Sequence, residues 1–204
     1  GDCAGANPHK FSSGSFTEGR IAAKAAVKYV LEQKPNPEVD DAVVEELKKK
    51  AYAPMERFEQ YRNLSVTEDV NPEYILPWQG LVRLQKIMDE YAAGIATIYK
   101  TNEKMLERAL ELLAFLKEDL EKLAARDLHE LMRAWELVHR VWTAEAHVRH
   151  MLFRKETRWP GYYYRTDYPD LNDDEWKCFV CSKYDAEKGE WAFEKVPYVQ
   201  IIEW

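Results

Sequence analysis

The spacing of apolar residues predicts a chain that is mainly α-helical. Apolar side chains recur every three or four residues over several long segments, which is the period of one face of an α-helix. Pro54 is expected to interrupt the second of these segments, because proline removes a backbone donor inside a helix. The expected helices span residues 15–33, 38–62, 79–91 and 102–123, and a fifth begins at residue 128.

The two longest helices carry apolar stripes that must be buried. Thr101 or Asn102 is expected to cap the first of them, and the run Asp127-Leu128-His129-Glu130 has the spacing of a capping box for the second. Stripes of this kind pack helix against helix, so the sequence predicts a helical bundle with these side chains as its core. The stripes comprise Leu106, Ala109, Leu110, Leu113, Leu116, Leu120 and Leu123, then Leu128, Leu131, Trp135, Val138 and Trp142.

Near the C-terminal end, short stretches with the residue pattern of β-strands replace the helical spacing of apolar residues. Residues 178–181 and 191–193 predict two strands joined through residues 186–189, and residues 199–202 predict a third. The expected result is a terminal β-hairpin that packs on the bundle or on a partner.

Composition and charge exclude some classes of function. The chain has 204 residues, 46% of them hydrophobic, and a formal net charge of -7 with a pI of about 5.4. An acidic chain of this kind argues against nonspecific nucleic-acid binding. No segment approaches the roughly 18 apolar residues of a membrane helix. Three cysteines form no disulfide framework in a chain of this length, so we expect a soluble protein of the reducing cytoplasm.

Two residue spacings resemble those of metal ligands, but neither predicts a metal site. Cys178 and Cys181 would point to opposite faces of a strand, and no second pair completes the four ligands of zinc. Glu136 and His139 have the spacing of a di-iron ligand pair, which needs a second such pair and two further glutamates. We therefore expect no metal in this chain and a solvated or hydrogen-bonded helix face at Glu136.

The first twenty residues form a loop of small residues that leads into a helix. Ser12, Ser13 and Gly14 keep side chains out of the way, so backbone N–H groups at the helix start can approach a polar ligand closely. Ser15 is expected to cap the helix and to leave its own amide and that of Phe16 facing outward. The alternative is an ordinary glycine- and serine-containing loop before a capped helix.

A second informative stretch follows the last long helix. Residues 156–176 combine proline, glycine, arginines and a cluster of aromatic residues, including Thr157-Arg158-Trp159-Pro160-Gly161. This loop offers more stacking surface than a simple connection needs, which favours a role in binding.

Both stretches resemble the fumarate reductase/succinate dehydrogenase flavoprotein family. The run from Gly1 to Arg20 is similar to the family's FAD-binding segment. That segment consists of an acidic residue, Gly-Ala-Asn, a basic residue, a run of small residues and then Ser-Leu at the start of a helix. The resemblance implies that Asp2 holds the FAD ribityl hydroxyls and that the amides of Ser15 and Phe16 lie against the flavin edge. Ser13 and Gly14 complete the expected FAD-binding set.

The second stretch resembles the end of the family's helical domain, a Ser-Arg-Gly-Ala-His segment followed by a double Asp before Trp. The resemblance makes Arg158 an expected substrate-binding residue. Trp159-Pro160-Gly161 replaces the usual Gly-Ala-His, and this departure is similar to the branch that acts on adenosine 5'-phosphosulfate. Two motifs about 140 residues apart in the right order are more specific than either alone.

That branch implies a defined chemistry in sulfur metabolism. Its members reduce adenosine 5'-phosphosulfate (APS) to sulfite and AMP through a flavin N5–sulfite adduct. Electrons come from an iron–sulfur partner subunit, which holds the [4Fe-4S] clusters, so a heterodimer is expected and none of the clusters belongs to this chain.

The residues around Lys10 are expected to bind the substrate. Lys10 stands where dicarboxylate enzymes keep an arginine, and a lysine grips an anion as a point charge rather than by a two-point fork. His9 is expected to donate a hydrogen bond or a proton to the departing AMP phosphate, and Phe11 offers a face that can stack on adenine or flavin. His9 and Lys10 are thus the expected catalytic residues. The alternative is that both face solvent at the rim of the loop, and that Phe11 packs under it.

The domain organisation follows from these motifs. Residues 34–37, Lys-Pro-Asn-Pro, predict a rigid linker. Residues 1–34 are expected to end an FAD-binding domain, residues 35–158 to form a helical domain, and residues 159–204 to form an aromatic loop and β-hairpin extension. The family's Gly-rich dinucleotide fingerprint is absent, so we expect a C-terminal portion of a larger flavoprotein, inactive by itself.

Two other interpretations stay open at this point. The chain can belong to another family member, such as a succinate dehydrogenase, fumarate reductase or aspartate oxidase flavoprotein, although Lys10 and the Trp-Pro-Gly segment disfavour this. It can also be a helical interaction module without a cofactor. Flavin absorbance of the purified protein separates the two classes.

Overall fold

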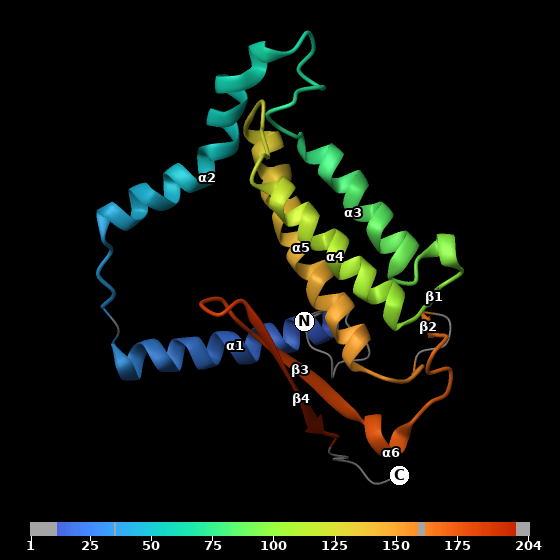
Figure 1. The fold of residues 1–204 in the computed structure, drawn as a ribbon. Coiled ribbons are helices and arrows are strands. Elements are labelled where there is room, and N and C mark those ends of the chain that lie inside the picture. The colour runs from blue at the N-terminus through green and yellow to red at the C-terminus, as the bar shows by residue number, and fades with distance from the viewer. Residues whose placement is uncertain (1–11, 35, 159–161, 199–204) are drawn as a thin grey trace. The chain divides into compact units, whose positions relative to one another are not determined.

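A computed structural model describes residues 12–34, 36–158 and 162–198 of the chain (Figure 1). The chain divides into two compact units, residues 1–45 and 46–204, which we describe separately. The predicted boundaries at residues 34 and 158 stay predictions. The described residues are mainly helical and end in an antiparallel β-hairpin, as the sequence predicts.

The first unit contains the long helix α1 (Ser12–Gln33). The helix already includes residues 12–14, so the predicted start at Ser15 is wrong by three residues. Lys34 ends it in a left-handed conformation with φ of 45°, while its backbone N–H still donates to the Val30 carbonyl at 3.0 Å. None of the α1 side chains that the structure describes is buried.

Helix α2 (Asp41–Tyr61) runs into the second unit without the predicted interruption. Pro54 lies inside the helix and is buried. Its carbonyl accepts a hydrogen bond at 2.9 Å from the Ala125 backbone N–H, in the loop before the last long helix. Packing on the bundle therefore outweighs the donor that proline removes. The short 3-10 helix η1 (Arg62–Leu64) follows.

Three helices form the bundle of the second unit: α3 (Pro77–Tyr91), α4 (Glu103–Leu120) and α5 (Leu128–Phe153) lie side by side (Figure 1). The side chain of Asn102 accepts from the Met105 N–H at 3.1 Å, which confirms Asn102 rather than Thr101 as the α4 cap. Asp127 caps α5 by accepting from the Glu130 N–H at 2.8 Å. Both predicted caps thus fix where the long helices begin.

The buried stripe of α4 agrees with the sequence. That of α5 agrees at Leu131, but beyond it the buried residues lie one position before the predicted ones. Leu128 is 66% exposed and Trp142 is 39% exposed, so neither belongs to the core. The α5 residues in the core recur with alternating spacings of three and four, as in a helix-packing seam. Small residues at two of these positions let the helices approach closely. The buried seam of α5 is Ala134, Leu137, Val141, Ala144, Val148 and Met151.

The tryptophans of α5 contact neighbouring elements instead of the seam. The indole N–H of Trp135 donates to the Ala51 carbonyl of α2 at 3.0 Å. Trp142 meets Tyr184 edge-on with ring centroids 5.3 Å apart, and the Lys117 ammonium lies 4.0 Å from its ring centroid. These large side chains attach α2 and the hairpin to the bundle.

The loop after α5 contains a strand that the sequence did not reveal. Strand β2 (Tyr164–Arg165) pairs in parallel with β1 (Lys100–Thr101), which follows the 3-10 helix η2 (Ile95–Thr97) just before α4. The Tyr164 N–H donates to the Tyr99 carbonyl at 2.7 Å. This two-residue pairing ties residues 162–170 to the start of α4.

The C-terminal hairpin comprises β3 (Cys178–Asp185) and β4 (Glu190–Pro197), preceded by the short helix α6 (Asp173–Trp176). Gly189 closes the turn with φ of 70°, a conformation that favours glycine. The hairpin packs on α5: Phe193 stacks on Phe153 with centroids 5.0 Å apart, and His150 lies 2.8 Å from the Ser182 hydroxyl. The predicted strand at residues 199–202 lies outside the described residues.

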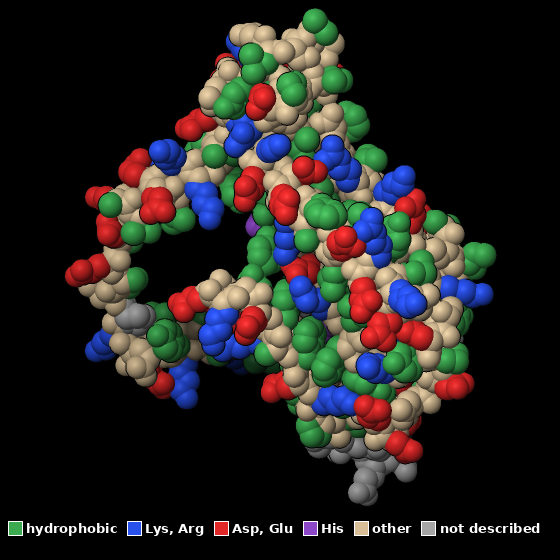
Figure 2. Space-filling view, in the orientation of Figure 1, with side chains coloured by type: hydrophobic (Ala, Val, Ile, Leu, Met, Phe, Trp, Pro, Cys, Tyr) green, Lys and Arg blue, Asp and Glu red, His purple; other side chains and the backbone are tan. Residues whose placement is uncertain are grey.

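Charged side chains of both signs intermingle over the face of the molecule in Figure 2. None of the described helices is long and apolar enough to cross a membrane.

Candidate functional site

The N-terminal loop carries most of the predicted site, and much of it lies outside the described residues. Asp2, His9, Lys10 and Phe11 belong to that part. Ser13, Gly14, Ser15 and Phe16 lie in the first turns of α1.

The first turn of α1 consists of small residues. Gly14 is half-buried, Ser15 is exposed and Phe16 is 79% exposed. Because the helix already includes Ser12, Ser15 lies inside it and is not its cap. The backbone N–H groups without a partner inside a helix are those of its first turn. The cofactor-binding roles of Ser13, Gly14, Ser15 and Phe16 stay predictions. Gly14, which has no side chain, and the small, exposed Ser15 suit the close approach of a planar group.

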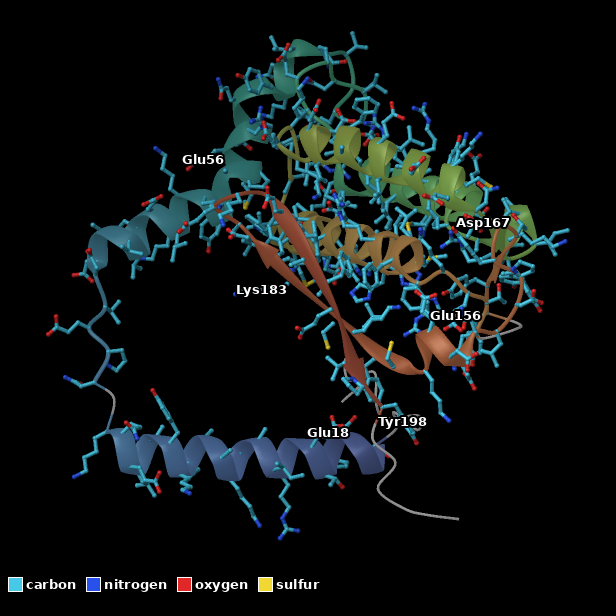
Figure 3. All side chains as sticks on the ribbon, turned by 60° about the horizontal axis from the view of Figure 1, so that its bottom comes forward. Glu18, Glu56, Glu156, Asp167, Lys183 and Tyr198 are labelled. Carbon is cyan, nitrogen blue, oxygen red and sulfur yellow. The ribbon has the colours of Figure 1, made fainter. Side chains whose placement is uncertain are left out.

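Arg158, the remaining predicted residue, belongs to an ion cluster centred on the buried Glu156, which is labelled in Figure 3. The Arg158 Nε donates to Glu156 Oε1 at 2.6 Å and its Nη2 to Oε2 at 3.0 Å. The same Nη2 donates to Asp173 Oδ1 at 2.8 Å. Two of the three guanidinium nitrogens are thus engaged within the chain. Substrate binding by Arg158 stays a prediction, and its contacts show a structural role beside it.

Glu156 is fully buried and holds a second arginine. Arg154 Nη1 donates to Glu156 Oε1 at 2.6 Å, and the Asn172 backbone N–H donates to Oε2 at 3.0 Å. Arg154 also donates to the carbonyls of Trp176 and Cys178 at 2.8 and 2.9 Å. The cluster therefore fastens the end of α5 to α6 and to the start of the hairpin.

The hydrogen bonds keep Glu156 ionised despite its burial. Burial raises the pKa of this carboxyl, but donation from Arg158, from the Asn172 N–H and from Arg154 outweighs it, so the pKa lies below its ordinary value of 4.5. A carboxylate between two guanidinium groups is the arrangement that a buried negative charge requires.

Arg165 forms a second anchor of the same loop. It is fully buried, and its Nε and Nη2 donate to the two carboxylate oxygens of Asp167 at 2.8 and 2.7 Å. Its Nη1 donates to the carbonyls of Met151 and Arg154 at the end of α5. Asp167 accepts in turn from the Glu103 N–H, at the start of α4, at 2.9 Å. One ion pair therefore joins the C-terminus of α5 to the N-terminus of α4, each end meeting the charge that its dipole favours.

Sequence reasoning missed Glu156, Arg165 and Asp167. The available signal was the alternation of Arg154, Glu156 and Arg158, because opposite charges two residues apart in an aromatic loop suit a buried ion cluster. The strand that places Arg165 is only two residues long, which is too short for any periodic pattern.

The two residue spacings that resemble those of metal ligands have other contacts in the structure. Glu136 pairs with Arg133 at 2.8 Å and lies 3.8 Å from Arg140 on a solvated face, as expected. In the register of the hairpin, Cys178 lies opposite Pro197 and Cys181 lies opposite Glu194. Among the described residues, no group of three or more His, Cys, Asp or Glu side chains could hold a metal ion.

Comparison with solved structures identifies close relatives. The chain is 92% identical to adenylylsulfate reductase from Archaeoglobus fulgidus, with a TM-score of 0.95, over 100% of this chain and 32% of that one. The same identity, TM-score and coverage hold for a structure of adenosine-5-phosphosulfate reductase in complex with sulfite as a covalent adduct.

Curated sequences and a family model agree with these structures. The chain is 48% identical to the alpha subunit of adenylylsulfate reductase from Megalodesulfovibrio gigas, over 98% of this chain and 30% of that protein. The chain thus spans about a third of the length of these relatives. The family model for the C-terminal part of the fumarate reductase flavoprotein matches residues 82–202. Since that match covers more than half of the chain, the chain belongs to the fumarate reductase flavoprotein C-terminal family.

Proposed function

We propose that this chain is the C-terminal part of the FAD-containing alpha subunit of an adenylylsulfate reductase, which reduces APS to sulfite and AMP. The observation that carries the proposal is the 92% identity over the whole chain to the Archaeoglobus fulgidus enzyme. The covalent sulfite adduct of the similarly matched structure supports sulfite as a product. The proposal includes an iron–sulfur beta subunit as partner and a cytoplasmic location.

The residues that the structure describes fit FAD at the start of α1. Small residues at positions 12–15 allow a planar group to approach the backbone, and exposed Phe16 leaves that end of the helix accessible. FAD supplies the electron transfer to the substrate sulfur when it is bound. The chain's own part is to bind and orient: Asp2 accepts hydrogen bonds from the ribityl hydroxyls, and Ser13, Gly14 and Ser15 border the isoalloxazine.

The adjacent residues hold the substrate anion. Lys10 places a point charge beside the phosphosulfate, and His9 donates a proton to the phosphate oxygen of departing AMP. Phe11 stacks on a ring of substrate or cofactor, and Arg158 contributes positive charge from the loop after α5. Stabilisation of charge on the leaving phosphate is the main demand of this reaction.

The test uses the full-length subunit together with its iron–sulfur partner. We expect oxidation of sulfite with ferricyanide as acceptor that depends on AMP, and flavin absorbance in the purified complex. Succinate oxidation or fumarate reduction without any sulfite activity would assign the chain to a dicarboxylate enzyme of the same family. A colourless, inactive protein would support the interaction-module alternative.

Replacing Asp2 by alanine in the full-length subunit is expected to weaken flavin retention. The ribityl hydroxyls lose a charged acceptor, worth about 1.5–3 kcal/mol. Flavin content after dialysis measures the effect, with Asp174→Ala, an exposed acid in α6, as the control. Equal flavin content in both variants would contradict the role of Asp2.

Replacing Lys10 by alanine is expected to lower kcat/KM for APS at least about tenfold, some 1.4 kcal/mol, while FAD stays bound. The loss reflects the missing positive charge beside the phosphosulfate. Steady-state kinetics of Lys10→Ala and His9→Ala are compared with Lys24→Ala, an exposed lysine of α1. Wild-type efficiency in both loop variants would limit this loop to flavin support.

A further inference from the structure

The β3–β4 hairpin is held on α5 by few side chains. None of the described residues of the two strands is buried. The half-buried Phe193 of β4 stacks on Phe153 of α5, with ring centroids 5.0 Å apart. The centroid of the half-buried Trp191 ring lies 5.8 Å from the Arg149 guanidinium carbon. An element with so few buried contacts separates from its neighbour at a lower free-energy cost than the core helices do.

His150 of α5 contacts both strands of the hairpin. Its Nε2 lies 2.8 Å from the Ser182 Oγ of β3, and its ring meets the Phe193 ring of β4 edge-on with centroids 5.1 Å apart. Ser182 and Phe193 are opposite each other in the register of the hairpin. The half-buried imidazole therefore joins α5 to one cross-strand pair.

Two opposing influences act on the protonation of His150. It lies in the last turn of α5, where the helix dipole favours a cation. Burial lowers the pKa of the imidazole below its ordinary value of 6.5, and the charges of His147 and Arg154 lower it further. Separation of the hairpin removes the burial and leaves the dipole. The docked hairpin therefore favours the neutral imidazole more than the separated hairpin does.

The surroundings of His150 offer no carboxylate to balance a proton. The charged groups that act on it from α5 are Arg154, a cation, and His147, which is a cation when protonated. The two hairpin side chains in contact with it are neutral. The next ionisable side chains along the hairpin and in α6 are Tyr184, Lys195 and Glu175, of which the last two pair with each other at 3.0 Å. Among the described residues, the Glu175 carboxylate is thus already engaged.

We propose that His150 is a pH-sensitive switch that holds the β3–β4 hairpin on α5 when it is neutral and loosens the hairpin when it is protonated. The imidazole Nε2 and the Ser182 hydroxyl can share a hydrogen bond in both protonation states, so the loosening comes from the buried charge. The proposal concerns this chain's own fold and does not rest on the proposed function.

The direction of the pH dependence follows from proton linkage. The separated hairpin leaves His150 with a pKa at or above 6.5, whereas the docked hairpin lowers it. Docking is therefore fully favourable well above pH 6.5, and it weakens as pH falls below 6.5 towards the pKa of the docked state. One proton changes the docking equilibrium by at most about tenfold per pH unit.

The test measures hydrogen exchange of the hairpin amides in the full-length subunit at about pH 7.5 and about pH 5.5, as protection factors corrected for the intrinsic exchange rate at each pH. We expect the protection of β3 and β4 to fall about three- to tenfold at the lower pH. The amides of α4, measured in the same sample, should change less than about twofold.

His150→Gln separates titration from contact. Glutamine takes up no proton, and its amide can still form a hydrogen bond with Ser182. We therefore expect the same hairpin protection at both pH values in this variant. The matched control is His129→Gln, an exposed histidine in the first turn of α5, which should keep the pH dependence of the wild type.

Equal hairpin protection at both pH values in the wild type would overturn the proposal. A fall shared equally by α4, or one that persists in His150→Gln and disappears in His147→Gln, overturns it too, since another event or group then titrates. If His150→Gln leaves the hairpin unprotected at both pH values, Ser182→Ala decides. That variant keeps the imidazole and should keep the fall in acid, and a pH-independent Ser182→Ala hairpin would contradict the switch.

Discussion

Replacing Glu156 by alanine is expected to lower the free energy of unfolding of the full chain by about 3–5 kcal/mol, the range for breaking a buried ion pair from one side. Glu156 is fully buried between Arg154 and Arg158, whose side chains are only 17% and 21% exposed. Its removal leaves two largely buried guanidinium groups without their common partner. The loss should exceed that of any surface ion pair in the bundle.

Chemical denaturation followed by tryptophan fluorescence measures this loss, because all seven tryptophans lie within residues 46–204. Glu136→Ala is the matched control, since Glu136 also pairs with two arginines but lies on a solvated face. It should change stability little. If Glu156→Ala were as stable as Glu136→Ala, the cluster would not hold the loop.

The pH dependence gives Glu156 a second signature. Its folded-state pKa lies below the ordinary value of 4.5, because donation from Arg158, Asn172 and Arg154 outweighs the effect of burial. Its contribution to stability is therefore fully present above pH 4.5, and it is lost as pH falls through the folded-state pKa. The difference in unfolding free energy between wild type and Glu156→Gln should be constant at neutral pH and shrink in acid.

The parts of the fold that could be predicted from sequence are those that local chemistry specifies. The caps Asn102 and Asp127, the leucine seam of α4 and the turn at Gly189 each depend on residues within a few positions of one another. Helical period and turn preference act at that range. These elements are therefore where the sequence predicts them.

The parts that could not be predicted depend on contacts between distant segments. Pro54 stays helical because its helix packs on the loop near Ala125. The buried seam of α5 includes Ala134 and Val141. The prediction chose the next residues along the chain, Trp135 and Trp142, because tryptophan is more hydrophobic than alanine. Local propensity carries no information about which neighbour a side chain meets.

The same distinction applies to the candidate site. A resemblance of short motifs led to the flavoprotein family, which the family match confirms. The resemblance also predicted a role for Arg158, but it did not predict the hydrogen bond of Arg158 to Glu156, two residues away. Motif matching predicts which residues act on a ligand, whereas the ion pairs that hold those residues become visible only in three dimensions.

Arg165 is the second position where a single change should have a large effect. Arg165→Ala is expected to lower the free energy of unfolding by about 3–5 kcal/mol. The buried guanidinium makes a two-point bond with Asp167 and caps the carbonyls of Met151 and Arg154. Its loss leaves Asp167, whose carboxylate is 26% exposed, without its cation, and leaves the end of α5 without a donor.

Arg165→Lys separates geometry from charge. A lysine keeps the positive charge but cannot reach both carboxylate oxygens and the two carbonyls at once. In the wild type, burial raises the pKa of Asp167, but donation from Arg165 and from the Glu103 N–H outweighs it, so the pKa lies below its ordinary value of 3.8. We therefore expect Arg165→Lys to lose roughly half as much as Arg165→Ala. Equal stability of Arg165→Lys and wild type would mean that charge alone anchors the loop.

A double-mutant cycle with Asp167→Asn tests whether the two residues act as one unit. The residues are in direct contact, so their effects should not add: the double variant should lose less than the sum of the single losses by about 1–3 kcal/mol. Arg108→Ala, which removes an exposed partner of Glu111, serves as the surface control. Additive losses would mean that Arg165 works through the α5 carbonyls alone. Under the proposed function, Arg165→Ala in the full-length subunit should also lower kcat/KM for APS, because the anchored loop carries Arg158, which we propose to bind the substrate.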